Sequence, residues 1–207
     1  MIPLEYKTVL NYAIAEFEER KSRFISTVKP VTTEEEAIEF INQLKSKYWD
    51  ASHNVYAYCI GGGNIIQRFS DDGEPSGTAG LPVLEVIKRM ELQDVVVVVT
   101  RYFGGIQLGA SGLVRAYAKS ASLGIEASGV VTKKLCKEVY VMLEYPVFDK
   151  VRNQVINYGY TIKDIKYTQN VDMIIMVPID EMDRFDEYIN EATNGEALVT
   201  VGEKEYV

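Results

Sequence analysis

Apolar and polar positions in the first part of the chain, residues 1–132, follow strand and helix periods in turn. Two strands are expected first, at 13–17 and 23–28. A helix follows them, because Thr33 and Glu36 have the spacing of a capping box. The predicted apolar stripe of this helix consists of Ile38, Ile41, Leu44 and Tyr48. Trp49, at its end, is expected to pack.

The middle of this part predicts a hairpin and a buried strand. Residues 54–60 and 65–69 flank Gly61-Gly62-Gly63-Asn64, a sequence typical of a tight turn. Residues 94–100 are a β-branched run without alternation, which predicts a strand buried on both faces. Two more helices are expected at 81–90 and 112–123, the second ending near Gly124.

From Lys133 onward the periods follow the order β-α-β-β-α-β, which is the ferredoxin-like split unit. These elements are expected at 137–145, 146–158, 161–167, 171–178, 180–192 and 197–203. The sequence therefore predicts an α+β protein with two domains, 1–132 and 133–207.

Composition excludes several classes of protein. Of the 207 residues, 47% are hydrophobic and 25% are charged, so the chain can build a core and is not disordered. The net charge of −8 opposes non-specific adhesion to nucleic acid. No signal peptide or membrane span is visible, and Cys59 and Cys136 are expected to be buried free thiols. A cytoplasmic protein without membrane contact is therefore expected.

Two glycine-rich loops, 71–80 and 101–112, carry the strongest candidate chemistry. Each is expected to lead into a helix, whose free N–H groups attract anions. The candidate phosphate or RNA contacts in and after these loops are Ser76, Thr78, Arg101, Tyr102, Gly104, Gly105, Ser111, Arg115 and Lys119. Arg115 and Lys119 are four residues apart and share a helix face. Neither loop has the spacing of a P-loop or of G-x-G-x-x-G, so the glycines could equally serve turns and close packing.

His53 is the only histidine, and the first loop carries three carboxylates that it could act with: Asp71, Asp72 and Glu74. They could supply acid–base groups. A structural, hydrogen-bonded histidine is the favoured interpretation, since no His–x–x–x–His or Glu–x–x–His spacing is present. No metal or cofactor is expected.

Two long motifs in the first part of the chain are specific enough to indicate a family. The first is Phe-Ser-Asp-Asp-Gly-Glu-Pro-Ser-Gly-Thr-Ala-Gly at 69–80, followed by Pro82. The second is Val-Val-Val-Thr-Arg-Tyr-Phe-Gly-Gly at 97–105, continued by Leu-Gly at 108–109 and Gly-Leu-Val-Arg-Ala-Tyr at 112–117. Both motifs resemble those of the IMPACT family, in its YigZ-like, two-domain bacterial form, and His53 and Ala57 also stand where that family has His and Ala.

The resemblance implies an N-terminal domain similar to domain IV of elongation factor G and to a small-subunit ribosomal protein. It implies a ferredoxin-like C-terminal domain. Eukaryotic relatives regulate translation initiation under amino-acid stress, by competing for the activator of an initiation-factor kinase. They use an additional N-terminal domain that is not in this sequence, so that role is not transferred. Without that role, the resemblance still implies that this protein is linked to the ribosome or to RNA.

Three functions are compatible with these observations. The first is a translation-associated regulatory protein that binds ribosome or RNA through the arginine-bearing loops, with Tyr102 or Phe103 stacking on bases. The second is an enzyme acting on a phosphorylated or acidic small molecule in a cleft between the two loops. The third is an adaptor whose acidic helix at 180–191 meets a protein partner in translation. The first is preferred.

Overall fold

A computed structural model describes residues 2–61 and 65–207. The chain divides into two compact units. The first is built mainly from Tyr6–Thr132, and the second combines Pro3–Glu5 with Lys133–Val207. No helix in the described residues is long and apolar enough to cross a membrane.

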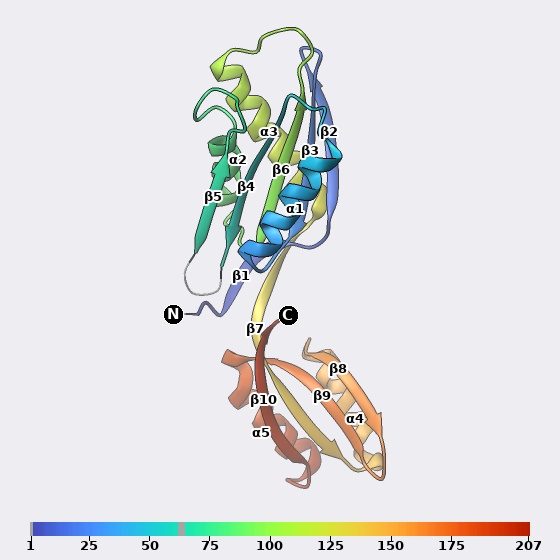
Figure 1. Ribbon diagram of the computed structural model, residues 1–207. Coiled ribbons are helices and arrows are strands. Elements are labelled where there is room, and N and C mark those ends of the chain that lie inside the picture. Colours follow the sequence, from blue (N-terminus) through green and yellow to red (C-terminus); the bar gives the residue numbers. More distant parts are fainter. Residues whose placement is uncertain (1, 62–64) are drawn as a thin grey trace. The chain divides into compact units, whose positions relative to one another are not determined.

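The first unit contains an antiparallel sheet with the strand order β2-β3-β6-β4-β5 (Figure 1). Its strands are β2 (Ala13–Glu19), β3 (Ser22–Pro30), β4 (His53–Ile60), β5 (Ile66–Ser70) and β6 (Val95–Tyr102). The predicted hairpin is β4 paired with β5. Its predicted glycine turn includes residues 62–64, which lie outside the described residues.

Helices cover both faces of this sheet. Helix α1 (Glu34–Lys47) packs on one face, and α2 (Gly80–Arg89) and α3 (Ala110–Ser128) pack on the other. The valines of β6 alternate between the two cores: Val95, Val97 and Val99 belong to the core under α2 and α3, and Val96 and Val98 to the core under α1. The prediction that this strand is buried on both faces is confirmed.

The predicted stripe of α1 is wrong at one position. Ile38 is 47% exposed, whereas Ala37, Phe40, Ile41 and Leu44 are buried. These four residues repeat at i, i+3, i+4 and i+7, so they form the face that meets the sheet. The expectation that Trp49 packs is also wrong, because this residue is 82% exposed.

Helix α3 does not end at Gly124. It continues to Ser128, and Gly124 lies inside it against β3. A Cβ atom at Gly124 would overlap the side chains of Ser26 and Val28. The glycine therefore permits close helix–sheet packing and does not terminate the helix.

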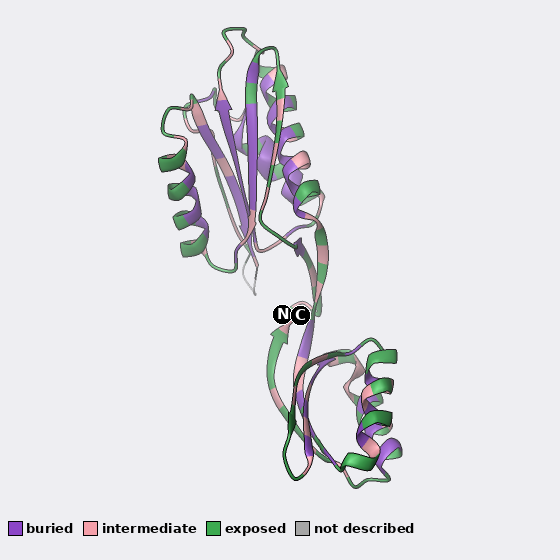
Figure 2. Ribbon diagram, turned by 90° about the vertical axis from the view of Figure 1, so that its right-hand side faces the viewer, coloured by how far each residue is buried: buried purple, intermediate pink, exposed green. Residues whose placement is uncertain are grey.

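The second unit has the predicted β-α-β-β-α-β order. Its elements are β7 (Val130–Leu143), α4 (Tyr145–Asn157), β8 (Thr161–Tyr167), β9 (Val171–Pro178), α5 (Met182–Thr193) and β10 (Leu198–Tyr206). The strand order is β10-β7-β9-β8, all antiparallel. Both helices lie on one face of this sheet and bury a single core (Figure 2). The two cysteines are buried free thiols.

Strand β1 (Glu5–Val9) was not expected from the sequence and runs beside β7. Residues Pro3–Glu5 belong to the second unit. The carbonyl oxygen of Leu4 accepts a hydrogen bond from Leu135 N at 2.7 Å, and that of Pro3 accepts one from the Tyr206 hydroxyl at 2.6 Å. The beginning and the end of the chain therefore meet in one unit.

Candidate functional site

Three loops gather at one end of the first sheet, at the top of Figure 1. They are the β2–β3 turn, the segment that precedes β4 and the loop that follows β6. Three hydrogen bonds tie them together: Gly104 N to Ser22 Oγ (3.2 Å), Phe103 N to Ser52 Oγ (3.0 Å) and the Tyr102 hydroxyl to Asp50 Oδ1 (2.9 Å). We call this end of the unit the tip.

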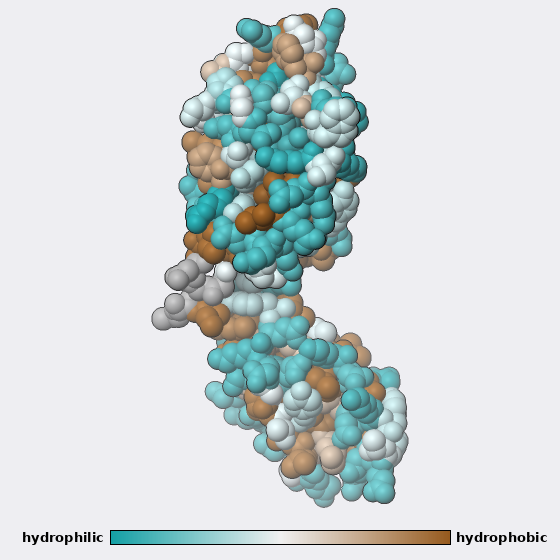
Figure 3. Space-filling model, in the orientation of Figure 1, coloured by the Kyte–Doolittle hydropathy of each residue, from teal (hydrophilic) through white to brown (hydrophobic). Residues whose placement is uncertain are grey.

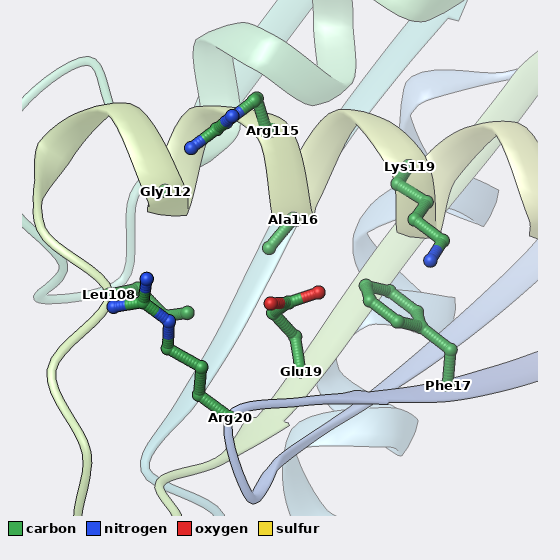
Figure 4. A pocket seen from close by; sticks show the side chains of 8 residues that line it. All are labelled: Phe17, Glu19, Arg20, Leu108, Gly112, Arg115, Ala116 and Lys119. Atoms are coloured by element: carbon green, nitrogen blue, oxygen red, sulfur yellow. The ribbon is translucent and has the colours of Figure 1, made fainter.

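A cavity of about 220 Å³ lies between α3 and the β2–β3 turn. We call it the basic pocket; its lining residues are Phe17, Glu19, Arg20, Leu108, Gly112, Arg115, Ala116 and Lys119. Figure 4 shows Arg115 and Lys119 on successive turns of α3 and Arg20 on the opposite side, with the carboxylate of Glu19 between them. Three cations and one carboxylate leave a net charge of +2 in a chain whose total is −8.

The three cations of the basic pocket are exposed and, within the described residues, none is ion-paired with a carboxylate. The Arg20 guanidinium donates to the carbonyl of Gln107 at 3.4 Å, and Lys119 Nζ lies 4.5 Å from the centroid of the Phe17 ring. The structure thus brings Arg115 and Lys119 together as their spacing predicts. Sequence reasoning missed Arg20, which lies in the turn joining β2 to β3 and has a φ of 47°.

The phosphate site expected at the start of α2 already contains a carboxylate. Asp71 accepts hydrogen bonds from three backbone N–H groups, those of Gly77 (2.8 Å), Ala79 (3.1 Å) and Gly80 (2.8 Å). The buried Thr78 hydroxyl donates to Pro75 O at 2.6 Å, and Ser76 is exposed. The backbone N–H groups at the start of this helix already donate to Asp71, so the structure does not favour the phosphate contacts predicted for Ser76 and Thr78.

Asp72 holds the loop in position. Its carboxylate accepts from Asn54 N at 2.6 Å and from Lys45 Nζ at 2.7 Å. Its carbonyl oxygen is 2.8 Å from His53 Nδ1. These contacts favour the structural interpretation of Asp72 over an acid–base role. No three His, Cys, Asp or Glu side chains of the described part of the chain gather as a metal site requires.

Arg101 and Glu74 form a buried ion pair. The guanidinium is 5% exposed and its Nη1 lies 2.5 Å from Glu74 Oε1, which also accepts the Tyr117 hydroxyl at 2.7 Å. Burial, and then the negative charge of Glu74, raise the pKa of Tyr117, so its phenol stays protonated as a donor. Arg101 is thus an internal partner of Glu74, not the exposed phosphate contact expected from the sequence.

The glycines after β6 have structural reasons to be glycine. A Cβ at Gly104 would overlap the backbone of Lys21. Gly105 has open space around it but a φ of 83°, which favours glycine. Tyr102 is half-buried, and Ser111 is exposed in the first turn of α3.

A second cavity of about 460 Å³ lies between the two glycine-rich loops. We call it the loop pocket; it is lined by Ser52, His53, Glu74, Pro75, Arg101, Phe103, Gln107, Leu108, Gly109, Ala110 and Leu113. Leu108 lines both pockets. The structure therefore joins His53, Glu74 and Arg101 at one cavity and leaves Asp71 and Asp72 outside its lining.

Comparison with known proteins gives two family matches. Residues 20–125 match the Impact N-terminal domain, and residues 141–196 match a domain of unknown function, DUF1949. A solved structure described as a hypothetical protein aligns with a TM-score of 0.63 at 26% identity, covering 99% of this chain and 100% of that one.

Individual relatives carry the same family name. The chain is 45% identical over 202 residues to the IMPACT family member YvyE of Bacillus subtilis, covering 98% of this chain and 93% of the relative. It is 35% identical over 128 residues to the IMPACT family member YigZ of Escherichia coli, covering 61% and 63%. These matches extend through both units, and the chain belongs to the IMPACT family.

Proposed function

We propose that this protein is a translation-associated regulatory protein that binds RNA, on the ribosome, through the tip of its first unit. The observation that carries the proposal is the basic pocket, where Arg20, Arg115 and Lys119 line one cavity. Phosphate groups are the ligands that such clusters of Lys and Arg bind most often in nucleic acids.

Exposed aromatic side chains in the loops of the tip support the same function. Phe103 is 49% exposed in the loop after β6, and Trp49 is 82% exposed in the segment before β4. In Figure 3, hydrophobic side chains lie among hydrophilic ones at this end of the unit. Aromatic rings beside cations can stack on unpaired bases, at about 1–3 kcal/mol per base. The acidic remainder of the chain restricts such binding to a local patch.

The proposal is tested by sedimentation with ribosomal subunits and by anisotropy with a single-stranded RNA, at about 50 and about 200 mM salt. The informative variant is Arg115→Gln/Lys119→Gln, because both side chains are exposed and their removal leaves the core intact. Its matched control is Lys88→Gln/Arg89→Gln, which removes the same charge from exposed positions on α2.

The wild type and the control are expected to bind with the same salt dependence. The basic-pocket variant is expected to bind more weakly, with a log–log salt slope shallower by roughly 0.7 for each RNA phosphate that the variant no longer neutralises. Equal binding by both variants, or no binding by the wild type at the lower salt, would contradict the proposal.

A further inference from the structure

The loop pocket has a polar floor that the proposed RNA contacts do not use. His53, Glu74 and Arg101 line it from three separate segments of the chain. Its volume of about 460 Å³ lies within the range of small-molecule sites. The side chains of Glu74 and Arg101 are 4% and 6% exposed, so these two charged groups are held in the protein interior and shielded from water.

The hydrogen bond of His53 determines which of its nitrogens carries a proton. Nδ1 lies 2.8 Å from the carbonyl oxygen of Asp72, which can only accept, so Nδ1 is the donor. In the neutral ring Nε2 then carries a lone pair. Nε2 is 3.8 Å from Glu74 Oε1, which is beyond a hydrogen bond. It therefore offers an acceptor to a hydroxyl or amine group in the pocket.

The opposite wall of the loop pocket offers hydrogen-bond donors, which are the backbone N–H groups at the start of α3. Helix α3 begins at this wall, with Gly109 as its N-cap, no capping side chain and no acidic residue in its first turn. Helix α2 differs, because Asp71 accepts from its first N–H groups. Arg101 lines the same pocket: its Nη1 donates to Glu74 and its Nη2 to Ser22, and its buried Nε finds no hydrogen-bond partner among the described residues.

The remaining lining is largely apolar. Pro75, Phe103, Leu108 and Leu113 contribute to it, and the Phe103 ring centroid lies 5.5 Å from the guanidinium carbon of Arg101. A ligand that fits this wall has a hydrophobic or aromatic body.

From these features we infer that the loop pocket binds a small organic anion. Its phosphate or carboxylate group meets the open start of α3, its body packs on Phe103 and Leu108, and a hydroxyl group donates to His53 Nε2. This site is separate from the phosphate contacts proposed for the basic pocket, apart from the shared Leu108.

The probes are phenyl phosphate and benzoate, with benzyl alcohol as the uncharged counterpart, each titrated into the full chain and followed by amide NMR shifts. At least one anion is expected to bind about tenfold more tightly than the alcohol and to shift the amides of Gly109, Ala110 and Ser111. Which anion binds more tightly distinguishes a phosphate ligand from a carboxylate one. No binding of either anion at millimolar concentration would overturn the inference.

Two variants test the position of the anion. Ala110→Asp puts a carboxylate in the first turn of α3, where it stabilises the helix and competes with the ligand, so anion binding is expected to fall at least tenfold. Asn42→Asp, an exposed change of equal charge on α1, is the control and is expected to bind as the wild type does.

His53→Gln provides a second measurement should Ala110→Asp fold poorly. Benzyl alcohol and 4-(hydroxymethyl)phenyl phosphate are expected to lose affinity in this variant, whereas phenyl phosphate, which lacks a hydroxyl group, is expected to lose little. Anion binding that survives Ala110→Asp but is abolished in Arg115→Gln/Lys119→Gln would place the anion in the basic pocket and refute the site. That outcome would leave the RNA proposal intact, so the two proposals fail separately.

Discussion

Glu74 is a buried carboxylate that pairs with Arg101 at the loop pocket. One of its oxygens accepts from both Arg101 and Tyr117, and the carboxylate is nearly inaccessible to solvent. The sequence identifies Arg101 and Glu74 as interesting but gives no sign that they meet, since 27 residues separate them. Burial and pairing depend on tertiary contacts, so an arginine in a glycine-rich loop is taken for a free cation until the structure is known.

Arg101→Ala is expected to destabilise the protein by about 3–5 kcal/mol, because it leaves the carboxylate of Glu74 buried and unpaired. Urea unfolding measures this change. Arg68→Ala is the control: its side chain is 62% exposed and 3.7 Å from Glu34, so a cost of about 1 kcal/mol at most is expected. Equal midpoints for the two variants would show that the buried pair contributes little. Because Arg101→Ala is expected to destabilise the fold, a loss of RNA binding in this variant would reflect unfolding. The RNA test therefore uses the exposed Arg115 and Lys119.

Helix α1 shows which elements the sequence predicts well. Its start is determined by local chemistry, and the structure confirms it: Thr33 Oγ1 accepts from Glu36 N at 3.2 Å. The Glu36 carboxylate accepts in turn from Thr32 N at 2.8 Å, one residue earlier than in a standard capping box. The end of α3 was missed because Gly124 is a common stop signal, and its actual reason, the closeness of β3, is not local.

The cap of α1 makes its stability depend on pH. The hydrogen bond from the Thr32 backbone N–H lowers the pKa of Glu36 in the folded state. The charged carboxylate therefore stabilises the fold above its ordinary pKa near 4.5, and this contribution disappears as the pH falls through the lowered value. Glu36→Gln is expected to melt below the wild type at about pH 6.5, with the difference shrinking below about pH 4.

Thermal melts across this pH range check the expectation, with Glu39→Gln as the control. Glu39 lies on the same helix, is exposed and accepts from the side chain of Gln43, not from a backbone N–H group. A wild-type advantage over Glu36→Gln that stays constant down to about pH 3 would contradict the assigned cause.

At the scale of the whole chain, the order of elements in the second unit was predictable from the sequence, but strand β1 was not. Alternating apolar positions and turn residues reveal β7 to β10 and the two helices, because those signals lie within each segment. Strand β1 packs beside β7, more than 100 residues away, and no local pattern indicates such a partner. The basic pocket was missed for the same reason, since it takes its walls from segments distant in sequence. The loop pocket, in contrast, lies where a cleft between the two glycine-rich loops was expected.

Removing residues 1–5 is expected to loosen the second unit at β7. The deletion takes away Leu4 O, the acceptor for Leu135 N, and Pro3 O, the acceptor for the Tyr206 hydroxyl. Hydrogen exchange should show faster exchange at the Leu135 amide. The neighbouring Lys134 amide, bonded to Val207 O at 2.9 Å, is the internal control. Unchanged protection at Leu135 would mean that the N-terminal segment adds nothing there.

The meeting of the two chain ends has a consequence for synthesis. Pro3 is translated 203 residues before Tyr206, the residue whose hydroxyl group donates to its carbonyl oxygen. At about 5–20 residues per second, Pro3 waits roughly 10–40 s before its partner exists. The first unit, built mainly from Tyr6–Thr132, has all its strands translated earlier and can fold while the chain is still growing. The second unit is completed only when β10 leaves the exit tunnel, so a truncated product would carry a folded first unit and an unfinished second one.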